Sequence, residues 1–271
     1  MHVHASLLAL TLIAAAAGLP LRGAIAPQQS SRSPWLRTDT ARFEIHYLPA
    51  LARDIGRVTR SAERAYDHVG ARLNFVLATK VPLVLSGPSA AMPTEAVIAY
   101  ALSDDVAPQR PHRSRIVLPV TERDADLDAA IVHELTHLLF GEIILPSQPG
   151  TGGVPRWVQE GIAHHMVGQW SEADTSLMRT LAASDRIPTL SRLTDETQFE
   201  NRRVNDVLGH AAFDYIASRW GDAGIRAFVE GLIVPRVDRI YENVIGLAPQ
   251  EFDAAFQQYA KRRFHIGAKR L

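Results

Sequence analysis

The chain has 271 residues and no cysteine, which excludes disulfides, thiolate nucleophiles, Cys-ligated zinc and iron–sulfur clusters. Any metal ion that it binds must therefore be held by His, Asp or Glu. An excess of one charge is also missing, because 29 Lys and Arg balance 29 Asp and Glu for a formal net charge of +0. General nucleic-acid binding needs a basic surface, so this balance argues against a nucleic-acid partner.

Long hydrophobic runs are also lacking. The apolar run Leu7–Leu21 is shorter than the roughly 20 residues that span a bilayer, and Pro20 interrupts it. Ala24 and Ala26 follow with one residue between them, which is the Ala-x-Ala pattern of a secretory cleavage site. We therefore expect residues 1–26 to be a signal peptide. The alternative is an uncleaved N-terminal anchor, because no Lys or Arg precedes the run.

A signal peptide predicts that the protein is exported. Exported proteins of eukaryotes commonly carry disulfides, so a chain without cysteine favours a bacterial periplasm or exterior. Contact with a membrane is expected only if the N-terminal segment stays uncleaved. No feature of the sequence indicates an oligomeric state.

The composition, with 46% hydrophobic and 21% charged residues, is that of a globular protein, and the length of 271 residues suits one domain or at most two small ones. Residues 27–36 are polar and contain Pro and Ser, which predicts a linker. We expect a single domain over residues 37–265 and a basic tail over residues 266–271.

Strand patterns come first in the chain and helical patterns follow, which predicts an α+β fold. Phe43, Ile45 and Tyr47 alternate with polar residues, as in a half-buried strand. The fold expected is a small mixed N-terminal sheet with a long helix, followed by a mainly helical half. Further strands are predicted at 81–85 and 115–120, with Pro119 favouring an edge, and a strand or short helix at 95–102. Helices are predicted at 51–73, 127–140, 155–167, 204–220, 223–232 and 252–264, and residues 187–199 are predicted to be irregular.

The stretch HELTH at residues 133–137 lies within a predicted helix. Residues four apart share one helical face, so the imidazoles of His133 and His137 can converge on one metal ion. Glu134 then lies beside the ion, where a carboxylate can take a proton from metal-bound water. The alternative is a helix with two surface histidines and a chance glutamate. The apolar residues around the motif argue against that alternative, because buried histidines need partners.

A catalytic zinc ion needs a third protein ligand and leaves a fourth position for water. Glu160 follows His137 by 23 residues, within the segment PRWVQEGIAHH at residues 155–165. Gly161 beside it would let two helices pack closely, and Trp157 can form a wall of the pocket. The alternative for Glu160 is an exposed helix carboxylate.

The two segments together resemble a gluzincin, specifically the peptidase MA-like group of zinc metallopeptidases. These proteins carry HExxH on one helix and Trp-x-x-Glu-Gly-x-Ala on the next, and Trp157, Glu160, Gly161 and Ala163 match the second pattern. The resemblance implies a zincin-like fold, Zn²⁺ held by His133, His137 and Glu160, and a peptide or protein substrate. It extends more loosely over about residues 37–265, where the flanking segments are compatible with the family.

Two further residues, His164 and His210, take expected roles from this resemblance. The family position four residues after the glutamate can orient a zinc ligand, and here it is His164, which could also compete as a ligand or simply pack. Where the family often presents a tyrosine that stabilises the oxyanion, this chain has His210, with Tyr215 one turn and a residue further. His210 can donate the same hydrogen bond or be an ordinary helix histidine. His165 is expected at the surface.

The expected activity is zinc-dependent hydrolysis of peptide bonds, with Glu134 as general base and His210 as oxyanion donor. One alternative is a hydrolase of another amide, such as a cell-wall peptide. Another is a non-catalytic, zinc-stabilised binding or scaffolding module of the exported compartment. The intact Glu134 argues against the module, because a structural zinc site has no use for a base. If neither His210 nor Tyr215 reaches the site, a weaker hydrolase or a zinc-binding relic is favoured.

Overall fold

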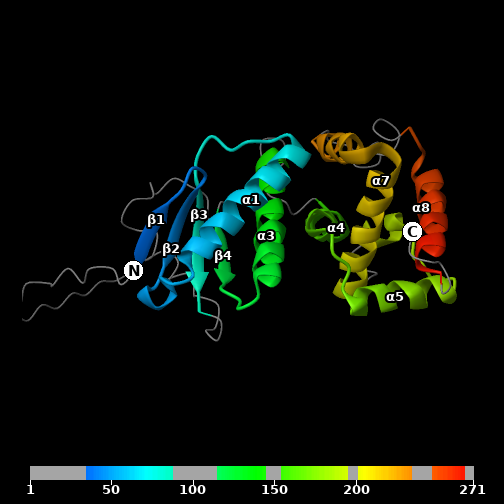
Figure 1. The fold of residues 1–271 in the computed structure, drawn as a ribbon. Helices are drawn as coiled ribbons and strands as arrows, with labels where there is room; N and C mark the ends of the chain where they lie inside the picture. Colours follow the sequence, from blue (N-terminus) through cyan, green and yellow to red (C-terminus); the bar gives the residue numbers. More distant parts are fainter. Residues whose placement is uncertain (1–34, 88–114, 145–153, 195–200, 234–245, 266–271) are drawn as a thin grey trace, which may run out of the picture. The chain divides into compact units, whose positions relative to one another are not determined.

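A computed structural model describes residues 35–87, 115–144, 154–194, 201–233 and 246–265 of the chain (Figure 1). All of them belong to one compact unit, Ser33–Leu271. The expected signal peptide, the strand or helix at 95–102 and the basic tail lie outside the described residues, as does all but the end of the expected linker.

The described N-terminal part forms a four-stranded mixed sheet in the order β1-β2-β3-β4. Strand β1 pairs antiparallel with β2, while β2, β3 and β4 run parallel to one another. Among the described strands β4 lies at the end of this order, as expected from Pro119, because a proline cannot donate to a neighbouring strand. The bounds are Leu36–Asp39 for β1, Phe43–Tyr47 for β2, Val81–Ser86 for β3 and Ile116–Pro119 for β4.

Seven α-helices make up most of the rest of the described chain, which confirms the α+β class. The predicted helices 204–220 and 223–232 are confirmed as the two parts of α7, which meet at a kink where Gly221 has a φ of 62°. The prediction of irregular structure at 187–199 is wrong in part, because α6 lies within it. The helices are α1 (Ile55–Leu73), α3 (Asp124–Ile144), α4 (Arg156–Val167), α5 (Glu172–Ala183), α6 (Leu190–Thr194), α7 (Arg202–Gly231) and α8 (Pro249–Phe264).

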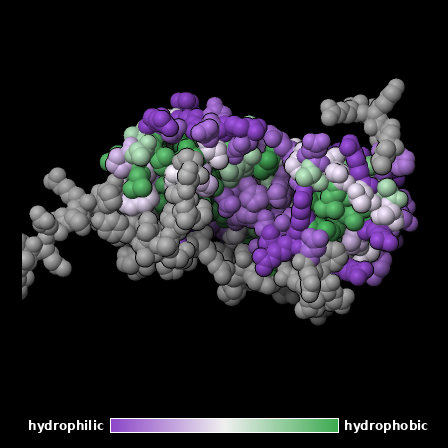
Figure 2. All heavy atoms as spheres, turned by 90° about the horizontal axis from the view of Figure 1, so that it is seen from below, coloured by the Kyte–Doolittle hydropathy of each residue, from purple (hydrophilic) through white to green (hydrophobic). Residues whose placement is uncertain are grey.

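The core continues from the sheet into the helices. Helix α1 buries one face, and its Tyr66 meets the ring of Phe43 on β2 edge to face, with 6.0 Å between the ring centroids. Helix α3 packs against both α1 and α4, and α4 packs against α7. On the face drawn in Figure 2 most of the described surface is hydrophilic, and hydrophobic residues reach it in separate patches. No helix among the described residues combines the length and the apolar character that crossing a bilayer requires.

Two glycines set the distance between α4 and α7. A Cβ atom on Gly161 would lie only 2.5 Å from the backbone of Gly209, so the two backbones touch where a side chain would hold them apart. The close packing expected at Gly161 is therefore confirmed, with α7 as the partner helix. This contact brings the start of α7 close to the face of α4 that carries Glu160.

Candidate metal centre

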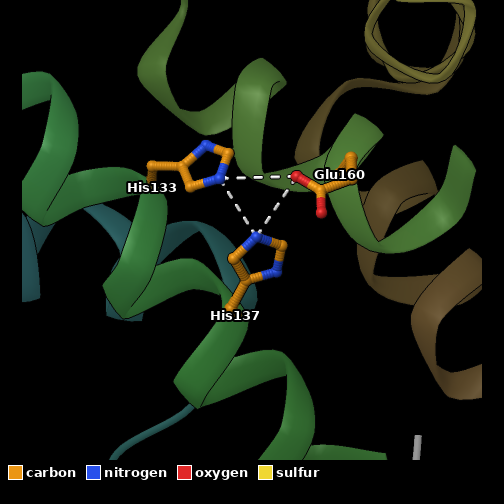
Figure 3. A group of neighbouring side chains, drawn as sticks. All are labelled: His133, His137 and Glu160. Atoms are coloured by element: carbon orange, nitrogen blue, oxygen red, sulfur yellow. Dashed lines mark hydrogen bonds and ion pairs between the residues drawn. The ribbon is translucent and has the colours of Figure 1, made fainter. Parts of the chain in front are cut away.

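His133, His137 and Glu160 come together from two helices (Figure 3). The Nε2 atoms of His133 and His137, both on α3, lie 3.1 Å apart. The Oε2 atom of Glu160, on α4, lies 3.5 Å from each of them. The three side chains retain between 18% and 27% of their exposure, so the cluster is partly open.

These distances fit a tetrahedral zinc ion. Zinc binds histidine nitrogen and carboxylate oxygen at about 2.0–2.2 Å, so two ligand atoms of a tetrahedron lie about 3.3–3.5 Å apart. The three observed separations, 3.1, 3.5 and 3.5 Å, fall close to that value. Two imidazoles and one carboxylate are also the ligand set of a catalytic zinc site, which leaves a fourth position open.

The sequence of α3 accounts for the placement of the two histidines. Ile131, Leu135 and Leu138 are buried and fix one face of the helix in the core. His133 and His137 lie on another face, one turn apart, and their rings meet edge to face with centroids 4.7 Å apart. The acidic first turn of α3 stabilises its N-terminus through the helix dipole.

Glu160 is held in its ionised form. Burial raises the pKa of this carboxyl group, but hydrogen bonds to His133 and His137 and the charge of Arg156 outweigh it and hold the pKa well below its usual range. An ionised carboxylate is the form that binds a metal ion.

Glu134 has the freedom that a general base requires. Its side chain is half-buried. Within the described part of the chain it makes no hydrogen bond and no ion pair. Its carboxylate is therefore not committed to a structural partner.

His164 lies next to the ligands without joining them. Its ring meets that of His133 with 4.9 Å between the centroids, and it does not belong to the group of converging donor atoms. Burial lowers the pKa of His164, and the neighbouring His133 lowers it further, so the neutral form dominates at pH 7. The arrangement gives no support to His164 as a competing ligand.

Neither His210 nor Tyr215 belongs to the group formed by the three converging donors. His210 is 4% exposed, and its ring stacks on Trp170 at 4.1 Å and lies 6.0 Å from the ring of His164. Its Nε2 is buried with no hydrogen-bond partner among the described residues, and burial lowers its pKa to about 4. Tyr215 is buried in the core between α7 and α8, against Phe252. The expected contact of either residue with an oxyanion therefore stays a prediction.

A second group of possible ligands consists of His165, His210 and Asp214. Arg72 approaches the Nε2 of His165 to 2.7 Å, and a guanidinium can only donate, so that nitrogen must accept. The Nδ1 of His165 then carries the proton and donates to Asp214 at 2.7 Å. A protonated nitrogen cannot bind a metal ion, so we interpret this group as a hydrogen-bond network rather than a metal centre.

Two expectations near the site are wrong. His165 is buried in the network just described and does not lie at the surface. Trp157 is 1% exposed and packs against Phe213 and Phe228, so it belongs to the core and forms no pocket wall.

Two residues beside the site were missed by the sequence reasoning. Arg156 lies one turn before Glu160 and contacts it, a pairing that the spacing of four residues could have revealed. Asp206, which also pairs with Arg156, is 50 residues away on α7, and no local pattern indicates that contact.

In comparisons with known proteins, no family model matches the chain and no curated protein matches it significantly. The gluzincin resemblance therefore rests on the residues of the segments 133–137 and 155–165.

Proposed function

We propose that the protein is a zinc-dependent hydrolase of peptide bonds, a gluzincin-type metallopeptidase with a zincin-like fold. The observation that carries the proposal is the convergence of three donor atoms from α3 and α4 within 3.1 to 3.5 Å. Glu134 follows the first ligand directly, which is the placement that a general base needs. We also propose that the protein is exported, as the pattern of its N-terminal segment predicts.

The chain supplies the ligands and the base. His133, His137 and Glu160 would hold the ion. A zinc ion bound there lowers the pKa of its water to about 7 and polarises a substrate carbonyl. Glu134 would accept the proton of the attacking water and pass it to the leaving amine. Among the described residues its carboxylate has no hydrogen-bond or ion-pair partner, which supports this role.

The position of His210 bears on the expected rate. Loss of one oxyanion donor costs an enzyme about 10²–10³ in turnover. Because His210 and Tyr215 are buried and neither belongs to the group of converging donor atoms, we propose a hydrolase without a donor from either residue. Its turnover is then expected to be lower than that of a peptidase with the full set.

The same observation favours a second candidate, a non-catalytic module that keeps zinc for stability. The two candidates differ in what metal removal does. A module would lose its fold on chelation and hydrolyse no substrate at any zinc concentration. A hydrolase would lose activity on chelation and regain it with added zinc.

The experiment that tests the proposal is Glu134→Gln. Zinc should remain at one ion per chain, while hydrolysis of a quenched fluorescent peptide library should fall by about 10²–10⁴, the usual contribution of a general base. Glu172→Gln, which removes an exposed carboxylate at the start of α5, is the control and should leave both unchanged. Full activity of Glu134→Gln would overturn the proposed role.

A further inference from the structure

We propose that Arg156 and Asp206 form a positioning pair that orients the third metal ligand, Glu160. This inference rests on the proposed function, because it concerns the same zinc site. It adds a second layer of residues to the three that would hold the ion. The pair joins α4 to α7, so it also makes the geometry of the site depend on how these two helices pack.

The two carboxylate oxygens of Glu160 have different partners. Oε2 faces the Nε2 atoms of His133 and His137 at 3.5 Å. Oε1 lies 3.3 Å from Nη2 of Arg156, one turn earlier on the same helix. Because Arg156 engages one oxygen, the other is directed toward the histidines.

Asp206 fixes Arg156 in turn. Nε and Nη2 of Arg156 donate to Oδ1 and Oδ2 of Asp206 at 2.9 and 3.1 Å, which is a bidentate pair. Two parallel hydrogen bonds to a planar guanidinium set its orientation as well as its position. The side chains are 35% and 20% exposed, so the pair is shielded more than most surface ion pairs.

Asp206 reaches this position because α7 approaches α4 closely. The contact of Gly161 with Gly209 sets the separation of the helices, and Asp206 lies one turn before Gly209. The negative charge of Asp206 also balances that of Arg156. The pair therefore holds the ligand without adding net positive charge beside a divalent cation.

Residues that hold a metal ligand in place usually change metal affinity about 10- to 100-fold when they are removed. We expect a loss of that size for Arg156→Gln and for Asp206→Asn, measured as the zinc Kd in competition with a chromophoric chelator. Because Asp206 acts through Arg156, the double variant should bind zinc no more weakly than Arg156→Gln alone. If the losses of zinc affinity in the two single variants add up in the double variant, Asp206 does not act through Arg156 and the proposal is overturned.

A conservative change separates positioning from simple charge. Arg156→Lys keeps the positive charge but cannot make the bidentate contact with Asp206. Positioning predicts that its zinc affinity falls about as far as that of Arg156→Gln. Wild-type affinity in Arg156→Lys would overturn the proposal. Circular dichroism of each metal-free variant verifies the fold, and Arg156→Lys is the variant to compare if Arg156→Gln is unfolded.

The matched control is Arg203→Gln. Arg203 lies on α7, pairs with Asp174 at 3.1 Å and is 56% exposed. Its replacement should leave zinc affinity unchanged, so a loss as large as that of Arg156→Gln would overturn the proposal.

Wild type and Glu160→Gln separate this inference from the proposed function. If wild type binds zinc, Glu160→Gln loses it and Arg156→Gln keeps wild-type affinity, only the positioning pair is refuted. If wild type binds no zinc, both the proposed function and this inference are refuted.

Discussion

Acid is expected to destabilise the fold through His210. This histidine is buried against Trp170, and its Nε2 has no hydrogen-bond partner among the described residues. Burial lowers its pKa from 6.5 to about 4. Asp214, on the same helix, acts in the opposite direction, while His164 and His165 on α4 and Arg263 on α8 lower the pKa further.

The sign and size of the effect follow from proton linkage. The unfolded chain takes up a proton on this histidine near pH 6.5, and the folded chain does so only near pH 4. Between these values the unfolded state binds more protons, so stability is lost as the pH falls. Each pH unit in this window is worth about 1.4 kcal/mol, which makes the whole loss about 3 kcal/mol. That is a large part of the 5–15 kcal/mol typical of a folded protein.

The assay is urea denaturation of the metal-free protein between pH 7 and pH 4.5, followed by circular dichroism. His210→Phe keeps an aromatic ring against Trp170 and removes the titrating group, so its stability should fall by about 2–3 kcal/mol less than that of wild type over this range. His265→Phe, at an exposed position, is the control and should follow wild type. If His210→Phe and wild type lose the same free energy of unfolding, the burial of His210 is not the cause of the acid sensitivity of the protein.

Two further predictions concern the neighbourhood of the site. Gly161→Ala should destabilise the protein by at least about 3 kcal/mol in thermal unfolding, because its Cβ would overlap the backbone of Gly209. Gly56→Ala, whose Cβ would meet only the end of the Arg60 side chain at 3.6 Å, should change stability by less than about 1 kcal/mol, and equal losses would contradict the packing described. His164→Asn should still bind one zinc ion per chain by elemental analysis, and a chain without zinc would make His164 a ligand.

The elements that the sequence predicts well are those with a strong local pattern. Strand β2 shows plain alternation, and α1 carries its apolar residues at helical spacing. Strand β1 was missed because it is short and largely exposed at the edge of the sheet, so it has no alternation to detect. Helix α5 was also missed, although Ser171 caps its start by accepting a hydrogen bond from Asp174, a signal that the spacing of the two residues offers.

In the candidate site, too, contacts between residues close in the sequence could be predicted and contacts between distant residues could not. The spacing of four residues predicts the convergence of His133 and His137, because helical geometry alone determines it. Glu160 required the resemblance of a second segment. The buried network around His165 includes Arg72, which is 93 residues away, and local sequence patterns cannot predict such a contact.

The most direct test of the account is elemental analysis of the purified chain, with wild type compared with Glu160→Ala. Three ligands from two helices predict one zinc ion per wild-type chain and its loss in the variant. A wild-type chain without zinc, or a variant that retains the ion, would contradict the proposed metal centre.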